Sequence, residues 1–383
     1  MLGFCIQIEL KRMRIQFPKR VFGRQLAQLS VAVIGFAALT APQAPAATSY
    51  SIVDLGTLGG MGTWGTSLNN GGQVVGYSWT SGNATQHAFL YSGAEMTDLC
   101  GLVGDGRSQA NGINDAGQIV GESLIPGNSW YHGFLYSGGA VTDLGTLGGN
   151  YSYASAINLR GQVVGTSYTP SGTTHAFLYQ AGRMTDLGTL GGGSSIGEGF
   201  NNSGQIVGLS WTSGGVTYHG FLTTGQALQD LGSLYGGPSL ATSINDNGHI
   251  AGQAGDDKQN SQAFLLSDGT VLGLGTLGGT LSMAYCVNNR DQVVGYSNLS
   301  GDAGYHAFLY ENGVMEDLND LIPAGSNLDL KLAVGINEAG QILANSGDSG
   351  TGHAYLLTPI PEPSAVILSS LFGVLLLVLR RKR

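Results

Sequence analysis

Six of the seven histidines occupy one position of a recurring phrase, H-A-F-L-Y or a close variant of it. They are His87, His132, His175, His219, His306 and His353, with Gln262 in the remaining copy. A zinc site needs several imidazoles around one ion, whereas these occur once per repeat. The pattern therefore favours a structural role in which each histidine binds a nearby backbone or carboxylate group, and glutamine can also donate and accept hydrogen bonds.

Six aspartates also share one repeat position, at the start of an Asp-Leu phrase: Asp54, Asp98, Asp143, Asp186, Asp230 and Asp317. Calcium binds clustered oxygens, so single aspartates in separate copies indicate hydrogen bonds to a turn N–H or to the histidine of the same repeat. The adjacent pair Asp256 and Asp257, in a short charged loop, is a candidate Ca²⁺ site, with a solvated loop as the alternative. No other cofactor is indicated.

Catalytic residues should occur in only one or two copies of the repeat, at positions where the other copies have a different residue. Glu122 and Glu198 are unusual carboxylates in copies two and four and form a candidate acid/base pair. His249 is the seventh histidine and stands where other copies mostly have Gln. The Gly-rich stretches lack the lysine and the following helix of a phosphate-binding loop. No catalytic residue is predicted, and an enzymatic function stays open as an alternative.

Aromatic residues recur in a variable loop that follows the second apolar run of several copies. Trp79, Tyr168 and Trp211 share one loop position, and Trp130 lies late in the same loop of copy two. Aromatic side chains combine an apolar ring with a polar edge, which suits stacking on sugars. These four residues are the candidate ligand-binding set, and the alternative is that each ring packs on its own loop.

The elements that position these residues follow from the repeat. The Asp-Leu phrase, or Gly273 in its place, starts seven times at intervals of 43 to 45 residues. Each copy also has three further apolar runs; in copy two they lie around 113–114, 118–121 and 132–136. Four short strands in about 44 residues are typical of one propeller blade. Asn-x-x-Gly, with Asp291 replacing Gly once, predicts a tight turn with a left-handed fourth residue.

The predicted fold is therefore an all-β, seven-bladed propeller over residues 47–358, with four antiparallel strands per blade. Residues 50–55 form an outermost strand with no blade of their own, and the last copy, 335–357, lacks such a strand. The N-terminal strand should complete the last blade, which removes two free edges. Strands that are apolar on both sides predict sheets covered on both faces. Cys100 and Cys286 fall in copies that are not neighbours, which argues against a disulfide.

Charge excludes one class of partner. Between residues 47 and 363 there are six Lys or Arg against 24 Asp or Glu, a net charge of −18. Binding to nucleic-acid phosphates depends on lysine and arginine, so no nucleic-acid partner is expected. A cation or a neutral glycan fits this composition better.

The two ends carry targeting patterns. Residues 1–46 combine a basic region, an apolar run and Ala44-Pro45-Ala46, as a secretory signal peptide does, and Met13 is an alternative start to Met1. The C-terminal part, 359–383, contains Pro361, Glu362 and Pro363, an apolar segment over 365–379, and the basic tail Arg380, Arg381, Lys382 and Arg383. Fifteen residues span about 22 Å as a helix, short of a comfortable transmembrane length.

The C-terminal pattern resembles the PEP-CTERM sorting signal of Gram-negative bacteria that make exopolysaccharide. That resemblance implies export across the inner membrane, transient anchoring there, removal of the tail by an exosortase-type enzyme, and a final location on the outer surface or outside the cell. An ordinary C-terminal membrane anchor is the alternative.

A resemblance to the HAF repeat of bacterial extracellular proteins is carried by the repeated phrases D-L-G-T-L-G-G, I-N-x-x-G-Q-V-V-G and H-A-F-L-Y. This resemblance implies an extracellular location and no particular activity. The leading hypothesis is an exported, non-enzymatic surface or matrix module that contacts exopolysaccharide or surface proteins. The loop aromatics are its candidate glycan-binding residues, and a purely structural protein without a ligand is a further alternative. A polysaccharide-active hydrolase or lyase on the same scaffold is the alternative.

Overall fold

The computed structural model describes residues 49–99, 106–127, 129–225, 227–256, 260–347 and 351–361. The expected signal peptide, the apolar segment 365–379 and the basic tail of Arg380, Arg381, Lys382 and Arg383 lie outside these ranges, as do Glu362 and Pro363. Among the described residues, no helix has the length and apolar character needed to cross a bilayer.

The described chain is almost entirely β-structure with three short 3₁₀ turns. The strands are β1 Tyr50–Asp54, β2 Gly59–Leu68, β3 Val74–Thr80, β4 Gln86–Ser92, β5 Glu95–Asp98, β6 Ser108–Ile113, β7 Ile119–Leu124, β8 Tyr131–Ser137, β9 Ala140–Asp143, β10 Ser152–Ile157, β11 Val163–Tyr168, β12 Thr174–Gln180, β13 Arg183–Asp186, β14 Gly191–Phe200, β15 Ile206–Thr212, β16 Tyr218–Thr223, β17 Gln229–Asp230, β18 Ser239–Ile244, β19 Ile250–Gly255, β20 Ser261–Ser267, β21 Thr270–Gly275, β22 Gly278–Val287, β23 Val293–Leu299, β24 Tyr305–Glu311, β25 Val314–Asp317, β26 Leu330–Ile336, β27 Ile342–Ser346 and β28 Ala354–Pro359. The 3₁₀ turns are η1 Ser81–Asn83, η2 Ser300–Asp302 and η3 Leu318–Asp320.

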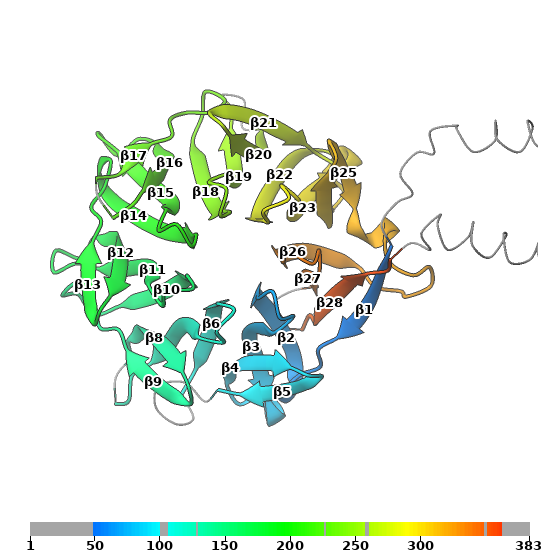
Figure 1. Ribbon diagram of the computed structural model, residues 1–383, viewed down its shortest axis with the longest axis horizontal. Coiled ribbons are helices and arrows are strands. Elements are labelled where there is room, and N and C mark those ends of the chain that lie inside the picture. The colour runs from blue at the N-terminus through cyan, green and yellow to red at the C-terminus, as the bar shows by residue number, and fades with distance from the viewer. Residues whose placement is uncertain are drawn as a thin grey trace, which may run out of the picture. The chain divides into compact units, whose positions relative to one another are not determined.

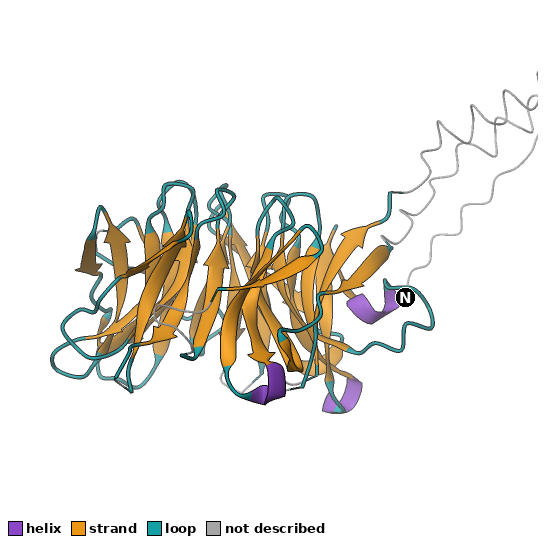
Figure 2. Ribbon diagram, turned by 90° about the horizontal axis from the view of Figure 1, so that it is seen from below, coloured by secondary structure: helices purple, strands orange, loops and turns teal. Residues whose placement is uncertain are grey.

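These strands form a β-propeller. Five antiparallel sheets have four strands each, in the orders β2-β3-β4-β5, β6-β7-β8-β9, β10-β11-β12-β13, β14-β15-β16-β17 and β1-β28-β27-β26. An eight-stranded sheet contains β18 to β25 and is joined by a single parallel pair, Ser261 with Leu281. Figure 1 shows the sheets following one another around a ring, with β6, β10, β14, β18, β22 and β26 at its inner edge. Figure 2 shows that the connecting loops gather at the two edges of the ring.

The turns between the first two strands of each repeat have the predicted form. The N–H of Gly72 donates to the carbonyl of Asn69, and Gly72 has a φ of 74°. The aspartate that replaces glycine, Asp291, adopts a φ of 59°, which aspartate tolerates better than most residues. Its carboxylate also accepts a hydrogen bond from Nδ1 of His249 at 2.7 Å. Two exceptions to the repeat therefore contact each other.

The ring is closed by the N-terminal strand, as predicted. β1 pairs antiparallel with β28, with Tyr50 opposite Pro359 and Asp54 opposite Tyr355. Tyr50 is fully buried, and its N–H donates to the carbonyl of Leu321. Strand β1 therefore covers an edge of β28 that would otherwise expose unpaired backbone groups.

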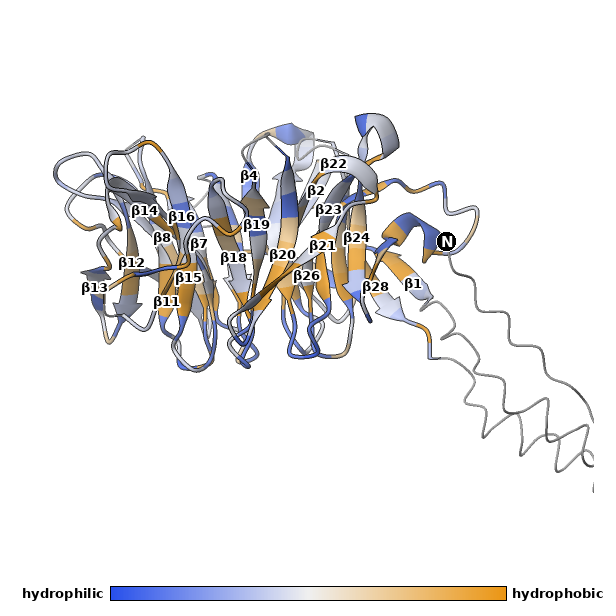
Figure 3. Ribbon diagram, turned by 90° about the horizontal axis from the view of Figure 1, so that it is seen from above, coloured by the Kyte–Doolittle hydropathy of each residue, from blue (hydrophilic) through white to orange (hydrophobic). Residues whose placement is uncertain are grey.

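The apolar cores lie between successive sheets. Val74 and Val75 are adjacent and both fully buried, yet Val74 packs in one cluster with Leu343 and Val75 packs in another with Ile119. Side chains of successive strand residues point to opposite faces, so each sheet contributes to two cores. Figure 3 shows apolar residues running along the strands and polar residues in many of the loops. The expectation that both faces of each sheet are covered is confirmed.

The closure can be tested with an engineered disulfide between Ser51 and Thr358, which are directly opposite in β1 and β28. In the double variant Ser51→Cys, Thr358→Cys, oxidation should form a bond that links positions 307 residues apart. Closing so long a loop restricts the unfolded chain, so the free energy of unfolding should rise by several kcal/mol. The midpoint of thermal unfolding should rise with it. The control pair Ser51→Cys, Leu356→Cys is two residues out of register, and equal crosslinking of both pairs would contradict the described pairing.

Candidate functional site

The repeated histidines and aspartates form pairs within each sheet. Nδ1 of each histidine lies 2.6 to 3.0 Å from a carboxylate oxygen of the aspartate on the neighbouring outer strand. The last pair joins His353 to Asp54 and so includes the closing strand. Several of these aspartates also accept a hydrogen bond from a turn N–H, as Asp143 does from Gly145 at 2.7 Å. The expected structural role of both residue types is confirmed.

The candidate calcium loop has a different arrangement. Both carboxylate oxygens of Asp256 accept hydrogen bonds from Asn260, one from its N–H and one from its Nδ2, each at 2.9 Å. Asp257 lies outside the described residues. Within the described ranges, no group of three His, Cys, Asp or Glu residues is arranged to hold a metal ion. Calcium binding at Asp256 and Asp257 remains a prediction.

The Gly-rich phrases and the loop aromatics lie against each other, which explains the glycines. A Cβ on Gly60 would come within 2.4 Å of the Cβ of Trp79, and one on Gly192 within 2.6 Å of that of Trp211. Any side chain at these glycines would therefore collide with the aromatic residue. At these positions the Gly-rich connections lie beside the ends of the strands that carry the aromatic residues.

Three of the four candidate aromatics lie at the ends of strands and not in loops, contrary to the prediction: Trp79 in β3, Tyr168 in β11 and Trp211 in β15. The four also have unlike environments. Trp211 makes an edge-on contact with Tyr218, its partner on the adjacent strand, with ring centroids 5.2 Å apart. The indole nitrogen of Trp79 is buried and has no hydrogen-bond partner. Trp130 is 44% exposed. Tyr168 packs against Tyr151 at 5.7 Å. Ligand binding by this set remains a prediction, and Tyr168 is the member that contacts Tyr151, the residue directly before β10.

Each inner strand carries a β-bulge at the same repeat position. In β14, for example, the pairing with β15 shifts between Gly197 and Gly199, so Glu198 is the extra residue. A bulge re-aims a side chain. The seven bulge residues are of six types, whereas the framework around them is repeated: Thr66, Asn111, Ser155, Glu198, Thr242, Tyr285 and Val334.

Three bulge side chains reach sideways to the next sheet. Oγ1 of Thr66 donates to the carbonyl of Ala110 at 2.7 Å. Asn111 and Thr242 make the equivalent bonds to the inner strands that follow them. Ser155 does not, and its Oγ is buried without a partner. Glu198 makes no hydrogen bond or ion pair to any described residue. In its ionised form it cannot make the equivalent bond, since a carboxylate has no proton to donate to a carbonyl.

The bulges of β6, β10 and β14 line a cavity of about 360 Å³, here called the central cavity. It is lined by Gln109, Asn111, Glu122, Tyr151, Tyr153, Ser155 and Glu198. The hydroxyl of Tyr151 donates to the carboxylate of Glu122, which crosses from one sheet to the next. The ring of Tyr151 contacts those of Tyr131, Tyr153 and Tyr168 at centroid distances of 5.7 to 6.2 Å. The site is thus a tyrosine cluster with two carboxyl groups.

The carboxyl groups in the central cavity have altered acidities. Burial raises the pKa of Glu198 to about 7. Burial also raises the pKa of Glu122, although the hydrogen bond from Tyr151 and the charge of Arg107 oppose that shift. Burial and the nearby Glu198 raise the pKa of Tyr153 to about 12. Glu198 retains some accessible surface, but protein surrounds it on most sides, so its charged form is poorly solvated.

The structure thus brings together the two glutamates that the sequence singled out. Sequence reasoning missed Tyr151 and Tyr153, because the repeat offers aromatics at many positions and only the sheet order selects these two. A usable signal existed at the bulge position, where a carboxylate in copy four replaces residues that mostly have hydroxyl or amide groups.

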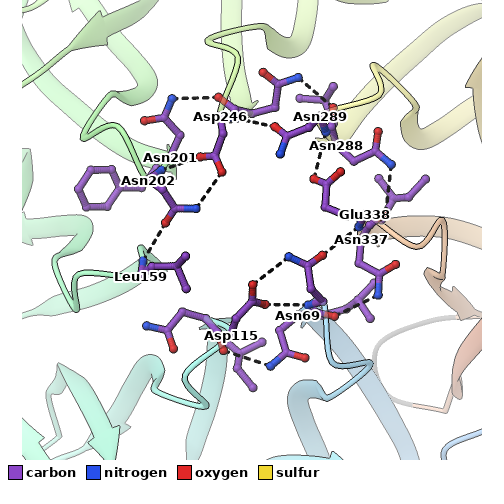
Figure 4. A pocket seen from close by; sticks show the side chains of 18 of the residues that line it. Asn69, Asp115, Leu159, Asn201, Asn202, Asp246, Asn288, Asn289, Asn337 and Glu338 are labelled. Carbon is purple, nitrogen blue, oxygen red and sulfur yellow. Dashed lines mark hydrogen bonds between the residues drawn. The ribbon is translucent and has the colours of Figure 1, made fainter.

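A second recess, of about 190 Å³, lies at the turn end of the inner strands (Figure 4). Its walls are tied by seven asparagines, each of which donates from Nδ2 to the backbone carbonyl of the next one around the ring, at 2.9 to 3.5 Å: Asn69, Asn114, Asn158, Asn201, Asn245, Asn288 and Asn337. The bond from Asn337 to Asn69 completes the circle.

The residues that follow these asparagines form an outer circle with one gap. In six steps, a backbone N–H donates to the side chain of the equivalent residue in the next sheet, as Asn202 does to Asp246 and Glu338 does to Asn70. The missing step is from Asp115 to Leu159, whose side chain has no acceptor. Leu159 is 50% exposed.

No family model matches the chain, and no curated protein matches it. Solved structures with a similar fold include TolB from Acinetobacter baumannii, with 11% identity, coverage of 89% of this chain and 71% of that chain, and a TM-score of 0.41. YCF48 bound to D1 peptide has 13% identity, coverage of 85% and 98%, and a TM-score of 0.49. Trypanosoma rangeli sialidase in complex with sialic acid has 10% identity, coverage of 85% and 59%, and a TM-score of 0.39.

Filling the gap in the outer circle should stabilise the fold. Leu159→Asn supplies an acceptor for the N–H of Asp115 and removes an exposed apolar side chain, so the free energy of unfolding should rise by roughly 0.5 to 1.5 kcal/mol. Leu159→Ala, which removes the apolar group without adding an acceptor, is the matched control. Urea denaturation measures both variants, and an Asn variant no more stable than the Ala variant would rule out the missing hydrogen bond as the cause.

The acidity of Glu198 predicts a pH-dependent stability. Its folded-state pKa of about 7 lies above the ordinary value of 4.5, so the folded state holds the proton more tightly than the unfolded state. The contribution of Glu198 to stability therefore falls as the pH rises from about 4.5 to about 7. The free energy of unfolding of Glu198→Gln, relative to that of the wild type, should therefore increase by up to about 3 kcal/mol between pH 4.5 and pH 8. Thermal unfolding at the two pH values measures this difference. The same change at the exposed Glu95 should not alter the pH profile.

Proposed function

We propose that this protein is an exported, seven-bladed β-propeller that binds a glycan in the central cavity between β6, β10 and β14. The eight-stranded sheet counts as two blades in this proposal, because its halves share only one parallel residue pair. The circle of seven asparagines, one per repeat, supports the same number. The ligand-binding role is non-enzymatic, in a surface or matrix module.

The proposed location outside the inner membrane rests on the terminal sequences and on the repeat. The propeller strands end at Pro359, where the N–H of Ile360 still donates to the carbonyl of Ser49 at 2.8 Å. Pro361, Glu362 and Pro363 follow directly, as a sorting signal placed just after a folded body would. We propose processing by an exosortase-type enzyme and delivery to the outer surface or the exterior, in keeping with the resemblance to HAF-repeat proteins.

The glycan proposal is carried by one observation: two tyrosines, two carboxyl groups and two amides converge on a cavity of about 360 Å³. That size falls within the range of small-molecule sites. Amides and carboxyl groups can bind sugar hydroxyls, and the faces of Tyr151 and Tyr153 can pack on the apolar faces of a sugar ring. Tyr168 extends this cluster towards the loops where the aromatic residues recur.

A polysaccharide-active enzyme is the second candidate, and the pKa of Glu198 favours it. A carboxyl with a pKa of about 7 is protonated often enough near neutral pH to act as a general acid, and Glu122 lines the same cavity. If this candidate is correct, incubation with the producer's own exopolysaccharide will generate new reducing ends or unsaturated sugars. Glu198→Gln would then abolish those products.

Binding can be tested by retention of the purified mature protein on the producer's immobilised exopolysaccharide. Tyr153→Ala should weaken retention about tenfold or more, since a ring that stacks on a ligand contributes on the order of 1 to 2 kcal/mol. Trp79→Ala in β3 and Trp211→Ala in β15 are matched controls near the loop ends of their strands and should retain binding. A loss in these two variants with none in Tyr153→Ala would move the site to the loop ends of those strands, and circular dichroism shows whether each variant is folded.

A further inference from the structure

We propose that the central cavity selects a ligand with a positively charged ammonium group, such as an amino sugar, and that Glu198 is its counter-ion. This inference rests on the proposed function in one respect: the same cavity holds the ligand. It adds the chemical class of that ligand, which no comparison with known proteins assigns.

Glu198 is a largely enclosed carboxyl group without a partner among the described residues. It lies on the bulge of β14 and lines the cavity, yet no described residue donates a hydrogen bond to it or pairs with it. The equivalent side chains Thr66, Asn111 and Thr242 each donate to the next inner strand. A buried charge without compensation costs several kcal/mol. A carboxyl group at a position suited to a donor therefore weakens the fold unless a ligand compensates it.

Two tyrosines lie near Glu198, and no positive charge among the described residues acts on it. Tyr153 of β10 and Tyr285 of β22 both lie close enough for Glu198 to raise their pKa. The other groups that line the cavity near it are Asn111, Ser155 and Glu122. Arg107 acts on Glu122 and is not among the charges that act on Glu198. Glu198 is therefore the carboxyl group in the cavity that lacks a counter-charge.

These features match an ammonium ion better than a neutral or an acidic sugar. An ammonium group is a compact charge with up to three N–H donors, and it is attracted to the faces of tyrosine rings as well as to carboxylates. It can also donate to the unpartnered Oγ of Ser155. A neutral sugar leaves the charge of Glu198 uncompensated, and a carboxylated sugar adds repulsion from both glutamates.

Binding should depend on pH through Glu198. An ammonium ligand requires the ionised carboxylate, and the ionised fraction falls about tenfold for each pH unit below the pKa of about 7. The apparent affinity is reduced by the same factor. A neutral sugar that accepts a hydrogen bond from the protonated carboxyl group would show the opposite trend.

Calorimetry with small probes tests the inference on the full mature protein. At pH 7.5, the methyl glycoside of glucosamine should bind at least tenfold more tightly than those of glucose and N-acetylglucosamine. Tetramethylammonium, whose charge does not titrate, should bind at pH 8 and weaken about tenfold per unit below pH 7. Glu198→Gln should remove both the preference and the pH dependence, whereas Glu95→Gln, an exposed carboxyl of the same kind, should keep them.

The outcomes separate this inference from the proposed function. Equal binding of the glucose and glucosamine glycosides, lost in Tyr153→Ala, would overturn the ammonium preference and leave glycan binding in place. Binding of tetramethylammonium with no binding of any glycoside would support the counter-ion role and overturn the glycan. A preference for glucosamine that survives in Glu198→Gln would overturn the assignment of Glu198.

Discussion

Every sheet of this propeller has apolar residues on both faces, and that constraint organises the rest of the molecule. Val74 and Val75 are neighbours in sequence, yet they are buried in different cores. A sheet of this kind needs a neighbour on each side, so a linear stack would leave two apolar faces in water. A closed ring leaves no apolar face exposed to water. The pairing of β1 with β28 places the first strand of the chain in the last blade.

Polar groups then fix the spacing of the sheets that the apolar cores hold together. The asparagine circle passes a side-chain hydrogen bond from each inner turn to the next, including the step from Asn337 to Asn69. The histidine–aspartate pairs tie the outer strands to their own sheets, and the closing pair is His353 with Asp54. Both sets repeat because every blade makes the same contacts within its sheet and with its neighbours.

The repeats differ at the inner bulges, and these positions can carry a function that the shared framework does not. The bulge directs one residue per blade away from the ladder, so this residue is free to vary while the framework stays constant. A carboxyl group at Glu198, beside Tyr153 and Glu122, gives one side of the ring a chemistry that the other blades lack. The cost of burying that carboxyl group is an argument for a compensating ligand.

Much of the architecture followed from the sequence alone, because the spacing of the repeats, the turn residues and the two-sided apolar strands are local properties. They led to a propeller closed by Tyr50–Asp54 and to structural roles for the histidines and aspartates. The candidate site did not follow in the same way. Glu122 and Glu198 are 76 positions apart, and nothing local shows that three successive sheets place them with Tyr151 and Tyr153 around one cavity. The sequence by itself determined what each repeat must be; only the tertiary structure decided which differences between repeats meet, because the meeting depends on sheet order and on bulges that re-aim single side chains.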